Sequence, residues 1–182
     1  MKTNKRRLFF AIPLNEKYTH LIRKYIQSYS ELNQLRWIKE ENLHVTMLFM
    51  GNVNAEYIPA LIETAEGVFT AAPKFELTPE NIIIKPSPGI PLMIWLKFKE
   101  NYLFSSIHTQ LKEEMKAFVE TPEARKPIPH ITLARIKNKN PVLLNPIEKL
   151  PKLIVDKIEL WESITDSGGA TYVNLKIFSL KG

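Results

Sequence analysis

A short pattern that occurs twice constrains the fold of this chain more than any other feature. Residues 44–47 and 130–133 share the order histidine, aliphatic residue, threonine, apolar residue. The two copies start 86 residues apart (130 minus 44), close to half of the 182-residue chain. An internal repeat at such a period indicates two similar structural units, each contributing one copy. We therefore expect two related lobes.

Each copy lies in a segment typical of a β-strand, where successive side chains point to opposite faces of the sheet. His44 and Thr46 then share one face of their strand, and His130 and Thr132 share one face of theirs. Polar side chains on an otherwise apolar strand are costly to bury unless that face meets solvent or a ligand. Two such strands facing each other would surround a small polar groove with two imidazoles and two hydroxyls.

This groove would suit acid–base chemistry at phosphorus. Histidine titrates near a pKa of about 6.5, so one imidazole can accept a proton while the other donates one. Threonine hydroxyls can donate hydrogen bonds to phosphate oxygens. A strained cyclic phosphate needs less assistance than a linear diester, so we expect neither a metal nor a cofactor. A single histidine-x-threonine in a strand is more often a hydrogen-bonded structural histidine, but two matching copies favour catalysis.

The pattern of apolar residues predicts an α+β fold. Strands are expected at residues 7–12, 36–38, 43–50, 75–84, 92–98, 130–136, 153–163 and 171–180, and helices at 18–29, 58–69 and 104–118. Gly51-Asn52 is expected to end the third strand, with turns at 86–89 and 166–169 and a basic loop at 137–141. Short connections of hairpin length favour a largely antiparallel sheet, and no flexible linker divides the chain, so residues 1–182 are expected to form one domain.

Composition narrows the functional classes. The formal net charge is +6, which favours a polyanionic partner, and the absence of cysteine excludes disulfides, thiolate metal sites and a cysteine nucleophile. No apolar run approaches the roughly 18 residues of a membrane span, and no signal peptide is recognisable, so we expect a cytoplasmic protein without a membrane partner. The motifs of nucleotide triphosphatases, dinucleotide-binding proteins and zinc proteases do not occur. Heptads are absent, and a monomer is expected.

The residues around both copies resemble the two-histidine (2H) phosphoesterase superfamily, specifically the RNA 2′,3′-cyclic phosphodiesterases also known as 2′-5′ RNA ligases. The resemblance is carried by residues 7–12, 36–38, 41–51 and 129–135, by Arg125, and by the closing hairpin from Leu160 to Tyr172. It implies a bilobal α+β fold of mainly antiparallel sheet with helices, with two lobes related by pseudo-twofold symmetry and an active-site cleft between them. It also implies hydrolysis of RNA 2′,3′-cyclic phosphate ends to 2′-phosphomonoesters.

The same resemblance implies roles for five residues. His44 would be the general acid on the leaving ribose 3′ oxygen and His130 the base that activates water, although the nearly symmetric repeat by itself leaves this assignment open. Thr46, Thr132 and Arg135 would hold phosphate oxygens. Arg135 lies five residues after His130, an odd offset that turns it away from the groove on an ideal strand, so the strand must end, bend or bulge before it.

Several alternatives remain at this stage. The same site could join a cyclic end to a 5′-hydroxyl as a 2′-5′ linkage, or the protein could bind RNA ends without catalysis. The partner could be RNA with a 2′,3′-cyclic phosphate end, such as a tRNA fragment, or a small cyclic nucleotide. Arg36 and Trp37 could stack on a base, although burial is favoured for Trp37. Phe49, at the position equivalent to Arg135, could pack in the core or support a base, and the core is favoured.

Overall fold

The computed structural model describes residues 4–85, 92–119, 127–137, 142–147, 150–166 and 169–182. Along the chain, the elements are β1 (Lys5–Pro13), α1 (Glu16–Gln27), β2 (Leu35–Trp37), η1 (Glu40–Asn42), β3 (His44–Asn54), η2 (Ala55–Tyr57), α2 (Ile58–Ala71), β4 (Phe75–Leu77), β5 (Pro79–Lys85), β6 (Met93–Phe98), α3 (Tyr102–Met115), η3 (Lys116–Phe118), β7 (His130–Ile136), β8 (Leu153–Val155), β9 (Lys157–Asp166) and β10 (Gly169–Ser179). The predicted α+β class is confirmed.

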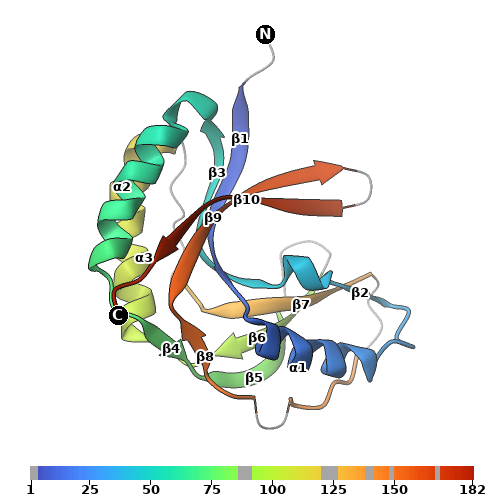
Figure 1. Cartoon of the computed structure of the whole chain (residues 1–182). Coiled ribbons are helices and arrows are strands. Elements are labelled where there is room, and N and C mark those ends of the chain that lie inside the picture. The colour runs from blue at the N-terminus through green and yellow to red at the C-terminus, as the bar shows by residue number, and fades with distance from the viewer. Residues whose placement is uncertain (1–3, 86–91, 120–126, 138–141, 148–149, 167–168) are drawn as a thin grey trace.

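One large sheet runs through the centre of the molecule, with strands in the order β10-β9-β1-β3-β7-β6-β5 (Figure 1). Strand β2 pairs with β7 outside this path, and β4 and β8 form a small separate sheet. The pairs between named strands in the described residues are antiparallel, as expected. The strands β1, β3, β9 and β10 make one half of the large sheet, and β2, β5, β6 and β7 make the other.

The helices begin where asparagine side chains cap them. The Asn15 side chain accepts a hydrogen bond from the backbone N–H of Tyr18 at the start of α1, at 2.9 Å. Asn101 does the same for the N–H of Phe104 at the start of α3, also at 2.9 Å. Each cap satisfies a backbone donor that the first turn of a helix leaves without a partner. Helices α2 and α3 lie side by side on one flank and α1 lies on another (Figure 1).

The apolar core is continuous across both halves of the sheet. Buried residues of β1 and β3 belong to the same cluster as those of β6 and β7. On the α1 side, Tyr18 is buried with its ring 6.4 Å from that of Phe98. On the other side, the ring centroids of Phe69 of α2 and Phe178 of β10 lie 5.0 Å apart. This shared core fixes the two halves against each other along the β3–β7 junction.

Two strands that the sequence analysis expected to be single are each split. The segment 75–84 divides at Thr78 into β4 and β5, and the segment 153–163 divides at Asp156 into β8 and β9. The first piece of each forms the small sheet, with Phe75 opposite Val155. The backbone carbonyls at the two breaks accept hydrogen bonds from residues just after other strands, Thr78 from Lys99 and Asp156 from Leu180. Apolar residues occur on both sides of each break, so their pattern could not reveal the change of sheet.

Strand β3 is longer than expected. Gly51 was expected to end it, but pairing with β1 continues to Asn54. Gly51 has φ of 71°, a conformation that glycine tolerates, and it follows a register shift that leaves Met50 without a partner on β1. The glycine therefore marks a bulge within the strand instead of its end. The expected turn at 86–89, most of the loop at 137–141, and residues Arg125 and Gly168 lie outside the described residues.

In the part of the chain that the structure describes, no helix has both the length and the apolar character needed to cross a membrane.

Candidate active site

The two histidine strands are neighbours at the centre of the sheet. Val45 of β3 pairs with Ile131 of β7 in antiparallel register, and both side chains are buried. Extending this register by one residue in each direction sets His44 across from Thr132 and Thr46 across from His130. Directly opposed side chains in such a pair have Cβ atoms about 4.5–5.5 Å apart. The tertiary structure thus brings the four predicted side chains together on one face, related by the twofold character of an antiparallel pair.

The same bulge follows each copy of the repeat. On β3, Met47 has no partner, because Thr46 pairs with Ala11 and Leu48 with Phe10. On β7, Leu133 has no partner between Thr132 and Ala134, which pair with Trp95 and Ile94. Each extra residue reverses the alternation of faces.

Each bulge changes the face to which the fifth residue after the histidine points. The bulge turns Arg135 back to the side of His130, and it turns Phe49 back to the side of His44; both side chains are exposed. The sequence analysis required a bend or bulge before Arg135, and β7 contains one. The expectation that Phe49 packs in the core is wrong, for the same reason: the bulge at Met47 brings its ring to the polar face.

Both imidazoles are held by the same backbone contact. His44 Nδ1 lies 2.7 Å from the carbonyl oxygen of Asn42, and His130 Nδ1 lies 2.7 Å from that of Ile128. A carbonyl oxygen can only accept, so Nδ1 carries the hydrogen in each ring. The proton exchanged in any reaction is therefore the one on Nε2: the neutral ring offers a lone pair there, and the protonated ring offers a donor.

The Nε2 atom of His44 lies 3.1 Å from Thr46 Oγ1. While His44 is neutral, Nε2 accepts and the threonine hydroxyl donates its single hydrogen to the ring. Once His44 is protonated, Nε2 becomes a donor, and the hydroxyl hydrogen is free to turn to another acceptor. The protonation state of His44 therefore decides whether Thr46 can donate to a ligand oxygen.

Three aromatic rings enclose His44. The ring centroids of Phe9, Trp161 and Tyr172 lie 5.1, 5.2 and 5.3 Å from that of the imidazole. Burial among these rings lowers the pKa of His44 to about 4, which the backbone contact with Asn42 opposes and the nearby His130 reinforces. In the free protein near neutral pH, this imidazole is uncharged.

His130 has a different environment. Its ring stacks on Trp95 with centroids 3.6 Å apart and planes inclined by 20°, and the Lys85 ammonium lies 5.6 Å from the Trp95 ring. Burial lowers the pKa of His130, the carbonyl contact with Ile128 opposes this, and the charge of Lys85 adds to the lowering. The backbone holds both imidazoles identically, but their surroundings differ.

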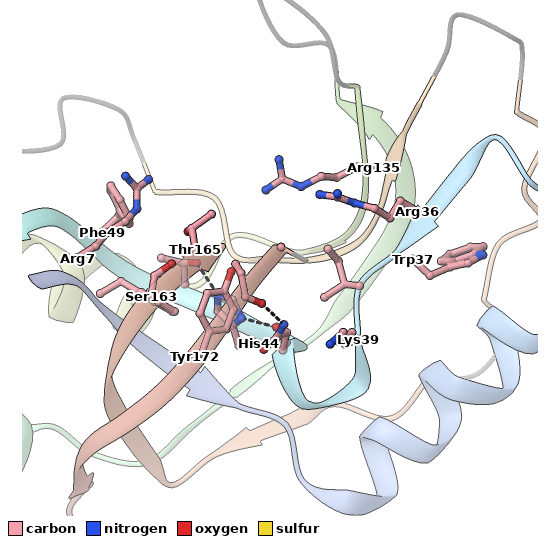
Figure 2. Close-up of a pocket in the computed structure, with 16 residues that line it drawn as sticks. Arg7, Arg36, Trp37, Lys39, His44, Phe49, Arg135, Ser163, Thr165 and Tyr172 are labelled. Atoms are coloured by element: carbon pink, nitrogen blue, oxygen red, sulfur yellow. Dashed lines mark hydrogen bonds between the residues drawn. The ribbon is translucent and has the colours of Figure 1, made fainter. Parts of the chain in front are cut away.

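A pocket of about 580 Å³ opens over this face (Figure 2). The described residues that line it include no carboxylate and four cationic side chains, which are Arg7, Arg36, Lys39 and Arg135. His44, Thr46 and Tyr172 form its floor, and Ser163 and Thr165 of β9 add hydroxyls; His130 and Thr132 are not among the lining residues. Burial raises the pKa of Tyr172, and the charges of Arg135 and Arg7 oppose the rise. The pocket is suited to an anion with several oxygens.

Comparisons with known proteins agree with this geometry. Residues 12–95 match the family described as LigT like Phosphoesterase, and this segment contains His44 and Thr46. An Archaeoglobus fulgidus protein named RNA 2′,3′-cyclic phosphodiesterase is 27% identical over 94% of this chain and 99% of its own length. One of the same name from Thermotoga maritima is 25% identical over 91% of each chain. The chain is therefore similar to the LigT-like phosphoesterases, the family that it resembled in the sequence analysis.

The three-dimensional similarity extends over the whole fold. A Thermus thermophilus protein of known structure superimposes with a TM-score of 0.85 and 25% identity, covering 97% of this chain and 98% of that one. Escherichia coli LigT in its apo form gives a TM-score of 0.81 with 23% identity over 98% and 99% of the two chains. This confirms the predicted bilobal fold of the LigT-like phosphoesterases.

Sequence reasoning missed part of the pocket. The sequence analysis placed Arg7 in the first strand and gave it no role in the site, yet its guanidinium lies 4.7 Å from the centroid of the Phe49 ring and lines the pocket. The period-two alternation of β1 could have placed Arg7 on the same face as Phe9. No pattern in the sequence indicated that Lys39 would line the pocket. Trp37, for which burial was favoured, is only partly buried and also borders the pocket.

The described residues contain no group of three or more histidine, cysteine, aspartate or glutamate side chains arranged to hold a metal ion.

Proposed function

We propose that this protein hydrolyses 2′,3′-cyclic phosphate ends of RNA to 2′-phosphomonoesters by general acid–base catalysis, without a metal or cofactor. The observation that carries the proposal is the pair of imidazoles on one face of the β3–β7 junction, each with Nδ1 fixed on a backbone carbonyl. A cationic pocket over the same face supports an anionic substrate. The names of the Archaeoglobus and Thermotoga relatives support RNA with a cyclic phosphate end.

In the proposed reaction, the phosphorus lies between the two Nε2 atoms. His130 Nε2 takes a proton from water, whose oxygen forms a bond to phosphorus. The bond from phosphorus to the ribose 3′ oxygen breaks, and His44 Nε2 donates its proton to that oxygen. The phosphate remains on the 2′ oxygen, and the histidines return to their starting states by exchanging protons with solvent. General acid–base catalysis of this kind typically contributes about 10²–10⁴-fold.

The hydroxyl and guanidinium groups stabilise the charge that develops on the phosphate oxygens. When His44 carries the proton that it will donate, the Thr46 hydroxyl no longer needs to donate to the ring and can bind a non-bridging oxygen. Thr132, across from His44 in the extended register, has the equivalent place on β7. Arg135 lies on the same face and offers two donors in one plane, which match two phosphate oxygens.

Phe49 and Arg7 provide the contact for the nucleobase. The Phe49 ring is 36% exposed and lies under the Arg7 guanidinium at the end of the pocket away from Arg36 and Arg135 (Figure 2). Single-stranded RNA is commonly bound by stacking of its bases on aromatic rings and guanidinium groups. We place the base of the terminal nucleotide on this pair.

The test is incubation of the protein with a short RNA ending in a 2′,3′-cyclic phosphate, with EDTA present. We expect a 2′-phosphate end, and a loss of at least about 10²-fold in kcat for His44→Ala and for His130→Ala. His20→Ala, on the exposed side of α1, is the matched control and should retain full activity. Full activity of either active-site variant would refute the assigned role.

Product analysis separates the alternatives. A 3′-phosphate product would mean that the 2′ oxygen leaves instead, and a 2′-5′-linked product with a 5′-hydroxyl RNA would show ligation at the same site. Binding of the RNA that weakens with salt, without turnover in a folded sample, would identify a non-catalytic RNA-end-binding protein.

A further inference from the structure

Two arginines stand directly opposite each other in the wall of the pocket. Arg36 of β2 pairs with Arg135 of β7, and both side chains are exposed and line the pocket. Figure 2 shows the two guanidinium groups extending side by side on the same side of the sheet. Like charges at directly opposed positions of an antiparallel pair destabilise the sheet. This cost needs a compensating interaction.

The described residues provide no compensating anion. Neither guanidinium has an ion pair or hydrogen bond to a carboxylate in the described part of the chain, although Arg6, Arg23 and several lysines form such pairs elsewhere. Lys39 adds a further positive charge to the pocket lining. An anionic ligand group between Arg36 and Arg135 would relieve the repulsion and accept hydrogen bonds from both.

The position of this pair along β7 separates it from the histidines. Strand β3 pairs with β7 at Ile131, and β2 pairs with β7 from Ala134 onward. From Thr132 to Arg135 the strand advances roughly 10 Å, at about 3.3 Å per residue. Arg135 can reach back toward a phosphate beside the histidines because its side chain is long. Arg36 reaches Arg135 from the neighbouring strand and lies beside the outer position.

We propose that Arg36, together with Arg135, forms a second phosphate site for the internucleotide phosphate that precedes the cyclic end. This inference rests on the proposed function and narrows its substrate class: an oligonucleotide end should be preferred to a cyclic mononucleotide, which has no such phosphate. The pair binds a phosphodiester through charge and planar hydrogen bonding, so the preference does not depend on the base.

The experiment compares two substrates, a 2′,3′-cyclic mononucleotide and a dinucleotide that ends in a 2′,3′-cyclic phosphate and has a free 5′-hydroxyl. We expect the wild-type protein to show the higher kcat/KM for the dinucleotide. Arg36→Gln should lower that value by about tenfold and should affect the mononucleotide much less. The slope of log(kcat/KM) against log salt for the dinucleotide should also become shallower by about 0.7, the amount expected for one phosphate contact on a single strand.

Lys17→Gln is the matched control, since it removes one exposed positive charge on α1 outside the pocket lining. It should leave the dinucleotide preference intact. Equal losses on both substrates in Arg36→Gln, or no loss on either, would overturn the second phosphate site. If the wild-type protein turns over neither substrate, the proposed function itself fails, so the two failures are distinguishable.

Discussion

The two histidines make the same hydrogen bond to the backbone, but the side chains around them differ. Each Nδ1 donates to the carbonyl two residues earlier, which leaves Nε2 as the reactive atom in both rings. Aromatic rings surround His44, whereas His130 stacks on a single indole. Burial lowers the pKa of both imidazoles in the free protein. In its proposed role as proton donor, His44 with a pKa of about 4 would be mostly deprotonated near neutral pH, so we expect bound substrate to raise this pKa.

The pH profiles of kcat and kcat/KM should therefore differ. A phosphate anion beside the rings favours the imidazolium form and raises the pKa of each histidine by roughly one to three pH units. The acid must be protonated, so activity falls as pH rises through its pKa. This fall should occur at a higher pH for kcat, which reports the substrate complex, than for kcat/KM, which reports the free protein. Measuring both profiles between about pH 4 and pH 9 tests this, and coincident falling limbs would contradict it.

At the scale of elements, the β9–β10 hairpin packs against His44. Trp161 of β9 packs against the imidazole, and its indole N–H donates to the buried carboxylate of Glu159 at 2.7 Å. Asn174 of β10 donates to the same oxygen, and Lys157 lies 3.1 Å from the other. The hairpin is also tied to the histidine turn, because the Asn42 side chain donates to the Ala170 carbonyl at 2.8 Å.

We therefore expect Trp161→Phe to destabilise the fold by roughly 2–4 kcal/mol, because the buried carboxylate loses a donor and the smaller ring leaves a gap. Urea unfolding of Trp161→Phe, Glu159→Gln and the double variant forms a double-mutant cycle. The bond from indole to carboxylate should appear as a coupling of about 1.5–3 kcal/mol. Strictly additive losses would show that packing alone holds Trp161 in place.

At the scale of the whole molecule, the buried His108 makes the stability of the fold depend on pH. It lies on α3 with 2% exposure, and neither ring nitrogen has a hydrogen-bond partner among the described residues. Burial lowers the pKa of His108, and the charge of Lys112 adds to the lowering. The pKa values of His44 and His130 are lowered as well. Below a pH of about 6.5 the unfolded chain therefore binds more protons than the folded one, and stability decreases as pH falls toward the lowered values.

His108→Leu should remove part of this acid sensitivity. The variant loses an unsatisfied buried polar group and cannot take up a proton, so its gain in stability should be larger at about pH 5 than at about pH 8. The difference should reach at most about 2 kcal/mol, the linkage energy between about pH 6.5 and pH 5. Urea unfolding at the two pH values measures it, with the exposed His20→Leu as control. An equal change at both pH values would mean that His108 is not protonated when the chain unfolds.

The sequence by itself determined the class of the fold and predicted which side chains would share the candidate site. The duplicated histidine–threonine pattern indicated paired strands with polar groups on one face, because side-chain alternation in a strand is a local property. The resemblance of the flanking residues indicated the family, and the oddly spaced Arg135 indicated that its strand could not be regular. The shared face follows from residue types and spacing, whereas the irregular strand before Arg135 follows from the role that the resemblance implies for it.

Only the tertiary structure decided how the two copies meet and what surrounds them. Strand order and register depend on contacts between residues far apart in sequence, such as Val45 with Ile131 and Arg36 with Arg135. The bulge at Met47 moved Phe49 from the expected core to the pocket, and the split at Asp156 was hidden because both pieces are buried. The aromatic surroundings that lower the pKa of His44 come from β1, β9 and β10 together. Apolar periodicity reports which face of a strand is buried, but not which partner buries it.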